Sequence, residues 1–140
     1  MLRRMTTRDS SRKAFDGTWE IVWTKVWRKD ALDLDGPAFI RFEKQLGANQ
    51  GEFKMIAVQG WLDCRYGERD GRPAVEFSWQ GTDEGDERCG RGWAVLVSES
   101  ELRGWLFFHC GDDSEFNARR STGATESRRS RKGRSPKVRQ

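Results

Sequence analysis

The sequence predicts an all-β domain, an antiparallel up-and-down meander that closes into a small barrel or half-barrel. Three observations lead to this fold class. Apolar and polar residues alternate along several segments, and alternation places successive side chains on opposite faces of a strand. Short runs of turn residues separate these segments, and short links favour antiparallel neighbours. Trp, which is common in strands, occurs seven times in 140 residues.

Residues 75–80, Val-Glu-Phe-Ser-Trp-Gln, show the alternation most clearly. Residues 18–28 are rich in Trp and β-branched side chains, which also favours a strand. Gly60 falls inside a longer predicted strand, where we expect it to mark a bulge or a bend. The strand pattern occurs in residues 18–28, 38–43, 52–66, 75–80, 92–98 and 102–110.

Turn residues separate the predicted strands. Asp70-Gly71 is typical of a tight hairpin, because both residues tolerate positive φ angles. Residues 81–90 predict a longer acidic loop, and residues 30–34 predict one helical turn. The remaining links are expected at Gly36-Pro37, residues 48–51 and residues 98–101.

Several predicted strands are apolar on both faces. In residues 18–28, Trp19 and Ile21 share one face, whereas Val22 and Val26 share the other. A flat sheet with one solvated face does not need this pattern. Either the sheet curls into a barrel with covered outer patches, or a second layer or a second subunit covers it.

The net charge of +4 is divided unevenly along the chain. Residues 1–13 carry +4 and predict a disordered basic arm, residues 14–118 carry −8 and form the predicted β domain, and residues 119–140 carry +8. The last segment has almost no apolar residues, so we expect a disordered tail rich in Arg and Ser. Its densest basic cluster would attract phosphate or another polyanion without reading sequence, and consists of Arg128, Arg129, Arg131, Lys132 and Arg134.

The composition excludes some classes of protein. No run approaches the roughly 18 apolar residues of a membrane-spanning helix. Residues 1–13 lack the apolar core of a secretory signal peptide. The three cysteines are odd in number, which favours reduced thiols and a cytoplasmic location.

The residues with reactive side chains form no strong catalytic pattern. His109 and Cys110 are adjacent at a predicted strand end, so their side chains would point to opposite faces and share no site. Cys110 and Cys64 are expected to behave as small buried apolar residues. Cys89, in the predicted acidic loop beside arginines, is the cysteine expected to be most reactive.

The carboxylates also favour structural roles. Asp63 shares a face with Arg65, which predicts an ion pair, and Glu76 lies on the polar face of its strand. Residues 83–87, Asp-Glu-Gly-Asp-Glu, could hold a calcium ion loosely but lack the twelve-residue EF-hand pattern. We therefore predict no catalytic residue, no metal site and no cofactor.

Residues 15–19, Phe-Asp-Gly-Thr-Trp, open the first predicted strand with a Gly-x-Trp motif. This motif resembles the strand entry of calycin barrels, the lipocalins and avidins. In those families a basic residue near the C-terminus packs over the Trp. The resemblance implies that Arg119 or Arg120 takes that position here.

A second resemblance covers most of the body. The strings Gly60-Trp-Leu-Asp-Cys-Arg65, Pro73-Ala-Val-Glu-Phe-Ser-Trp79 and Gly90-Arg-Gly-Trp-Ala94 are similar to those of a group of short bacterial proteins of unknown function. The resemblance implies a small bacterial β domain and supplies neither an activity nor site residues.

The abundance of Trp predicts a non-enzymatic binding module. Aromatic side chains on neighbouring strands can line a cavity for a small apolar or aromatic ligand. We expect this site at the barrel mouth, built from Trp23, Trp61, Trp79 and Trp93. The alternative is a homodimeric interaction protein whose basic C-terminal tail contacts nucleic acid or another polyanion. An enzyme that uses His109 or Asp63 is a third possibility.

Overall fold

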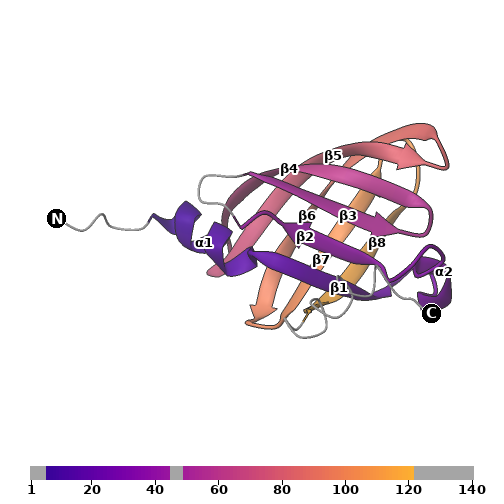
Figure 1. Ribbon diagram of the computed structural model, residues 1–140. Helices are drawn as coiled ribbons and strands as arrows, with labels where there is room; N and C mark the ends of the chain where they lie inside the picture. Colours follow the sequence, from indigo (N-terminus) through magenta and orange to yellow (C-terminus); the bar gives the residue numbers. More distant parts are fainter. Residues whose placement is uncertain (1–5, 45–48, 122–140) are drawn as a thin grey trace, which may run out of the picture.

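The computed structural model describes residues 6–44 and 49–121. It confirms the all-β class: eight antiparallel strands follow one another around a closed barrel, and the last strand pairs with the first (Figure 1). The strands are β1 (Gly17–Thr24), β2 (Phe39–Phe42), β3 (Gln50–Met55), β4 (Val58–Arg69), β5 (Arg72–Asp83), β6 (Asp86–Ser98), β7 (Glu101–Phe108) and β8 (Asp113–Arg120). Two helices, α1 (Thr7–Phe15) and α2 (Lys29–Leu32), lie at opposite ends of the barrel.

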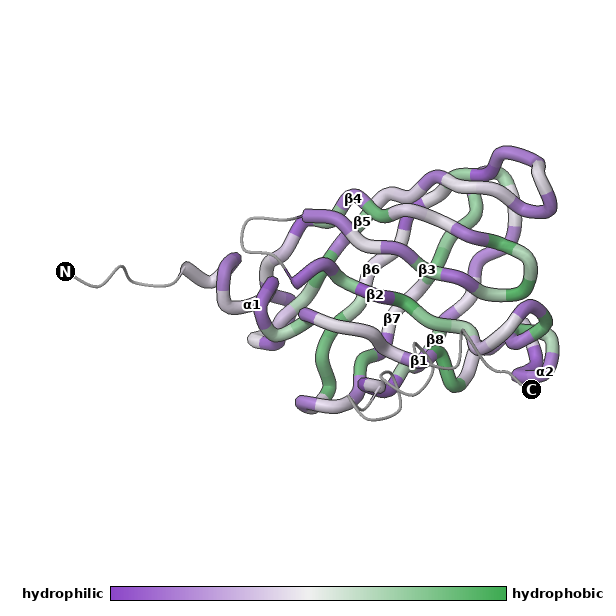
Figure 2. The backbone as a smooth tube through the Cα atoms, in the orientation of Figure 1, coloured by the Kyte–Doolittle hydropathy of each residue, from purple (hydrophilic) through white to green (hydrophobic). Residues whose placement is uncertain are grey.

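Alternation along the strands separates the interior of the barrel from its outer surface. In β4, Leu62 and Cys64 are buried, whereas their neighbours Trp61 and Asp63 are exposed. Hydrophilic and hydrophobic residues alternate in this way along much of the barrel wall (Figure 2). The period of two therefore sets which side chains form the core.

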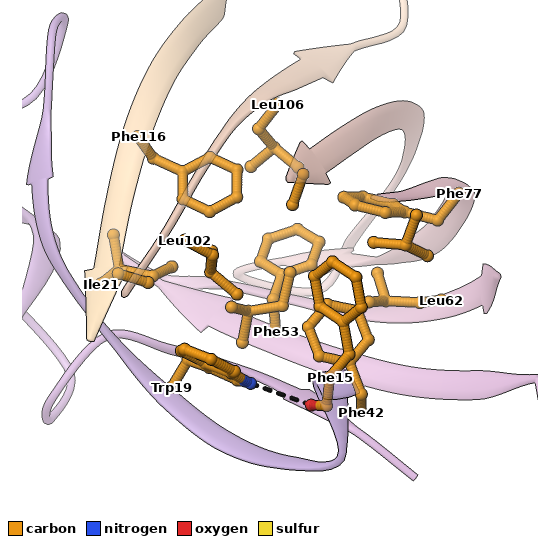
Figure 3. Close-up of a cluster of buried hydrophobic side chains, with 14 of the residues drawn as sticks. Phe15, Trp19, Ile21, Phe42, Phe53, Leu62, Phe77, Leu102, Leu106 and Phe116 are labelled. Carbon is orange, nitrogen blue, oxygen red and sulfur yellow. Dashed lines mark hydrogen bonds between the residues drawn. The ribbon is translucent and has the colours of Figure 1, made fainter. Parts of the chain in front are cut away.

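Large apolar side chains fill the barrel interior (Figure 3). The ring of Phe53 meets that of Trp79 edge to face, with centroids 4.9 Å apart. Such pairs stabilise a core beyond the area that they bury. The fully buried side chains include Phe15, Trp19, Phe42, Phe53, Leu32, Ile40, Met55, Leu102, Val75 and Cys64.

Gly60 makes room for this core. We expected a bulge or bend at Gly60, but the pairing of β4 with β3 and β5 continues through it without a shift in register. A Cβ atom at Gly60 would lie 2.4 Å from Cε1 of Phe53 and 2.9 Å from Cε3 of Trp79. Glycine at this inward position therefore leaves space for two aromatic rings.

Helix α1 closes one end of the barrel, where we expected a disordered arm over residues 1–13. The Thr6 side chain accepts a hydrogen bond from the Asp9 backbone N–H at 3.0 Å, which caps the helix. Phe15, fully buried, packs against Phe42 and Tyr66 with centroid distances of 5.2 and 5.9 Å. The expectation of disorder is wrong for the described part of that arm, because a cap and one docked aromatic ring fix the helix.

Arg120 seals the same end. Its guanidinium lies over the indole of Trp19, 4.1 Å from the ring centroid, and donates hydrogen bonds to the backbone carbonyls of Asp16 and Ala14. This is the position that the Gly-x-Trp resemblance implied for Arg119 or Arg120. Both arginines belong to β8, so the predicted tail boundary at residue 119 is wrong for them.

The connections differ from the prediction at two places. The predicted strand over residues 52–66 is two strands joined by a tight turn, in which Ile56 has a φ of 58°. The predicted loop over residues 81–90 is a short hairpin between Asp83 and Asp86. The body ends in a further strand, β8, which completes the barrel. Helix α2 confirms the helical turn expected near residues 30–34.

Arginine side chains cover part of the apolar outer surface. The guanidinium of Arg69 lies 4.3 Å from the ring centroid of Trp93, and that of Arg91 lies 4.2 Å from the ring centroid of Phe107. The indole of Trp105 stacks on Phe107, and its N–H donates to Asp113 at 2.6 Å. Barrel closure together with these contacts accounts for strands that are apolar on both faces.

Candidate functional site

Four connections surround the end of the barrel opposite α1. They are the segment 25–38, which includes α2, and the links between β3 and β4, β5 and β6, and β7 and β8. A pocket of about 460 Å³ lies among them. This volume is within the range of small-molecule sites in proteins.

The pocket has an apolar floor and a polar rim. Trp27, Ile56, Val58 and Phe108 supply the apolar surface. The rim carries groups that can donate or accept hydrogen bonds and can therefore orient a ligand. These rim residues are Asp83, Arg88, His109, Cys110, Gly111 and Asp112.

A chain of aromatic rings runs from the floor of the pocket into the barrel. Trp27 meets Phe108 with centroids 6.0 Å apart, and Phe108 meets Trp79 at 5.1 Å. Trp79 continues to Phe53, and its indole N–H donates to the carbonyl of Phe107 at 3.1 Å. The tryptophans at the mouth and in the core are thus coupled by direct ring contacts.

Side-chain hydroxyls hold the segment that carries Trp27. The Thr24 hydroxyl accepts from the Trp27 backbone N–H at 2.9 Å and donates to the Trp27 carbonyl at 2.6 Å. The Ser114 hydroxyl accepts from the backbone N–H of Val26 at 3.1 Å. Thr24 and Ser114 are both buried, and the hydrogen bonds that they make are partly shielded from water.

Two residues of the pocket lining have a left-handed backbone. Ile56 has a φ of 58° and Cys110 a φ of 56°. For a β-branched residue such as Ile this conformation costs on the order of 1–3 kcal/mol. The Ile56 turn is held in place by a 2.8 Å hydrogen bond from its backbone N–H to the carbonyl of Leu32 in α2. The fold therefore keeps a strained apolar residue at the pocket.

The four predicted site tryptophans do not form one site. Trp79 is 2% exposed inside the barrel, whereas Trp23 and Trp61 are 46% and 51% exposed on its outer surface. Trp93 also lies outside, beneath Arg69. Strand alternation explains this result, because it directs Trp79 into the barrel and directs Trp61 and Trp93 to its outer surface.

The sequence reasoning missed Trp27 and Phe108 as site residues. Trp27 follows the end of β1 at Thr24, so strand parity does not determine its direction. Phe108 is the last residue of β7 and faces the pocket. Both residues lie in or next to connections at the same end of the barrel. This position would have identified them as pocket residues only if the strand order had been known.

Potential reactive groups are dispersed or paired. Cys110 lies in the turn after β7 and is exposed, so the expectation of a buried strand residue is wrong. Both it and His109 border the pocket, because the turn removes the strand alternation expected to separate them. Cys64 is buried, as expected, and burial raises the pKa of its thiol to about 12. Cys89, exposed on β6, lies outside this pocket.

The carboxylates take the structural roles expected of them. Asp63 forms an ion pair with Arg65 at 2.5 Å, and Glu76 lies 3.8 Å from Arg69. Within residues 6–44 and 49–121, no three His, Cys, Asp or Glu side chains are grouped to hold a metal ion. The predicted polyanion-binding residues all lie outside the described part of the chain: Arg128, Arg129, Arg131, Lys132 and Arg134.

No protein-family model, curated protein or solved structure matches this chain. Among the described residues, no helix has both the length and the apolar character needed to cross a membrane. The geometry of the site therefore carries the functional argument.

Proposed function

We propose that the protein is a non-enzymatic binding module, similar in architecture to the calycins, that binds a small, largely apolar ligand at the end of its barrel opposite α1. The observation that carries this proposal is the pocket of about 460 Å³, which has aromatic and aliphatic residues on its floor and polar groups on its rim. An apolar surface with a few polar groups is the usual composition of a ligand site.

Two further features support the proposal. Arg120 over Trp19 and the closed eight-stranded meander agree with the calycin resemblance of the Gly-x-Trp motif. Ile56 has a strained backbone and also lines the pocket, and strain of this kind tends to occur at functional sites. A structural turn at this position would be more stable with Gly or Asn.

Binding of N-phenyl-1-naphthylamine, an uncharged apolar dye, tests the proposal. We expect saturable dye fluorescence together with quenching of Trp emission, because Trp27 and Trp79 contact Phe108 at the pocket floor. Ile56→Asp places a charge in the pocket lining and should weaken dye binding at least about tenfold.

Leu34→Asp is the matched control. Leu34 is 67% exposed at the same end of the barrel but does not line the pocket, so this variant should bind the dye like the natural protein. A folded natural protein that shows no saturable binding would contradict the proposal. Equal affinities of the natural protein and Ile56→Asp would place the dye elsewhere and also contradict it.

The homodimer alternative has less support. The most exposed large apolar side chains are Trp23, Val26, Leu34 and Trp61. Three of them belong to β1 or the segment before β2, whereas Trp61 lies on β4, three strands further around the barrel from β1. These four side chains come from separate parts of the outer surface. Arg69 and Arg91 cover two other outer rings, those of Trp93 and Phe107.

A further inference from the structure

Trp27 separates two spaces in the barrel. On one side is the open pocket, and on the other is a small cavity inside the barrel. Trp27 is the one residue that lines both. Its indole therefore forms the wall between them, together with the ring of Phe108, which it contacts edge to face.

The inner cavity is small and mainly apolar. Its volume is about 10 Å³, close to the minimum that holds one water molecule. Besides Trp27, Thr24 and Ser114, its lining consists entirely of apolar side chains: Ile21, Ile40, Phe53, Met55, Leu106 and Phe116. A cavity with such walls favours a hydrocarbon group over water.

The hydroxyls of Thr24 and Ser114 belong to the lining of this cavity and also hold the Trp27 segment in place. Thr24 bonds both backbone polar groups of Trp27, and Ser114 bonds the N–H of Val26. One further bond, from the Lys25 N–H to the carbonyl of Glu115, joins the segment to β8. Four local hydrogen bonds thus keep the wall closed.

The opposite side of the segment faces solvent. Lys25, Val26 and Arg28 are exposed, and the residues from Lys25 to Arg28 belong to no helix or strand. An outward shift of Trp27 therefore breaks these local bonds without disrupting a strand pair of the barrel. The apolar area that the indole loses can be replaced by the apolar area of a ligand.

We propose that the apolar end of the ligand replaces the indole of Trp27, so that the open pocket and the inner cavity become one elongated site. This inference rests on the proposed function and specifies the ligand as a molecule with a narrow uncharged hydrocarbon end. The end enters the barrel beside Phe53 and Phe116, while the remainder stays among the polar groups of the rim.

Two substitutions test the wall with N-phenyl-1-naphthylamine as the probe. Trp27→Ala removes the indole and should tighten dye binding about tenfold or more, because the combined site is then open in the free protein. Thr24→Val keeps the indole and the shape of the side chain but removes two hydrogen bonds, and should tighten binding about threefold or more. Thr82→Val, at an exposed Thr outside both spaces, is the matched control and should leave affinity unchanged.

Fluorine NMR of protein labelled with 5-fluorotryptophan follows the indole itself. The Trp27 resonance is assigned from its loss in Trp27→Phe. On dye binding to the natural protein it should shift and gain a larger solvent isotope effect, whereas the resonance of Trp19, buried at the closed end, should not change.

The outcomes separate the two proposals. If Ile56→Asp weakens dye binding but Thr24→Val does not tighten it and the Trp27 resonance stays in place, the pocket proposal stands and the inference about Trp27 is wrong. Unchanged or weaker binding by a folded Trp27→Ala also contradicts the inference. If Trp27→Ala does not fold, Thr24→Val and the fluorine spectra decide the question.

Discussion

The guanidinium of Arg120 lies 4.1 Å from the indole centroid of Trp19 and joins the last strand of the barrel to the first. It also donates hydrogen bonds to the carbonyls of Asp16, Ala14 and Glu99 at 2.7, 2.9 and 3.1 Å. One side chain therefore ties α1, β1 and the β6–β7 turn together. The fixed fork of donors in Arg suits this task better than the single ammonium of Lys.

Arg120→Ala should lower the free energy of unfolding by about 2–4 kcal/mol, through the loss of charged hydrogen bonds and of the cation–π contact. Arg120→Lys should recover only a minor part of this loss. Arg119→Ala is the control: Arg119 is the exposed neighbour in β8, so this change should stay within about 0.5 kcal/mol. Urea unfolding followed by Trp fluorescence measures all three, and equal effects at positions 119 and 120 would contradict the prediction.

Gly60→Ala should destabilise the barrel by about 1–3 kcal/mol, because the new Cβ would lie 2.4 Å from a ring carbon of Phe53 and force the core to shift. Gly67→Ala, in the same strand, is the control, since an added Cβ there meets nothing within 4 Å. It should be neutral or stabilising by up to about 1 kcal/mol. Thermal or urea unfolding of the pair tests the role of Gly60 in making space, and a neutral Gly60→Ala would exclude it.

Only two of the three thiols should react in the native protein. Cys89 and Cys110 are exposed, whereas Cys64 is fully buried and burial raises its pKa to about 12. A thiol that stays protonated is a poor nucleophile. Titration with a disulfide reagent at neutral pH should count two thiols in the native state and three in denaturant. Cys64→Ala should leave the native count at two, and a native count of three would contradict the burial.

Ligand should protect Cys110 and not Cys89. Cys110 lines the open pocket, whereas Cys89 lies outside it on β6. Saturating dye should therefore slow alkylation of Cys110 by iodoacetamide several-fold and leave the rate at Cys89 unchanged. Peptide mass spectrometry measures both rates in one sample, so Cys89 is an internal control. Equal slowing at the two cysteines would argue against binding in the pocket.

Stability should fall in alkaline solution because of Cys64. Burial raises the pKa of its thiol from 9.0 to about 12, so above about pH 9 the unfolded chain releases this proton while the folded protein retains it. The favourable contribution is therefore complete below pH 9 and is lost as the pH rises towards 12. Burial also raises the pKa of the neighbouring Tyr66, which adds a loss of the same sign at higher pH.

Urea unfolding of the natural protein at about pH 8 and about pH 10.5 should differ by at least about 2 kcal/mol from Cys64 alone. Cys64→Ala should reduce this difference by about that amount, even though the variant is less stable at both values. An unchanged pH dependence in Cys64→Ala would assign the alkaline loss to other groups.

Most of the regular strands could be predicted from the sequence, whereas β8, the turn between β3 and β4, and helix α1 could not. Alternation around Phe77 and Trp79 identified β5 as a strand with one inward face. The turn between β3 and β4 was not predicted, because Ile56 adopts a left-handed backbone there. Gly or Asn usually occupies that conformation, and a β-branched residue gives no turn signal. The helix α1 was missed because one apolar side chain, Phe15, docks it, and a single docked ring leaves no helical period to detect.

The residues that line the pocket at the end of the barrel could not be predicted from the sequence. The sequence placed an aromatic-lined pocket at the barrel mouth, and a pocket with aromatic residues is found there. Residue type could not select the lining, because Trp23, Trp61 and Trp93 lie on the outer surface and Trp79 lies behind the floor. The pocket lining combines residues from separate connections, among them Trp27, Ile56 and Phe108. These residues come together only because the strand order places four connections at the same end of the barrel.

The pairing of β1 with β8 joins the first and the last strand of the sequence. The hydrogen bonds from Arg120 to Asp16 and Ala14 span 104 and 106 residues, so the barrel closes through its most distant contacts. Contacts of such separation form slowly, because the entropy of closing a long loop is lost before the contacts stabilise the chain. During synthesis, a nascent chain that ends before β8 presents β1 and β7 as two unpaired strand edges. We therefore expect the incomplete chain to be prone to aggregation until β8 has left the ribosome and paired with β1 and β7.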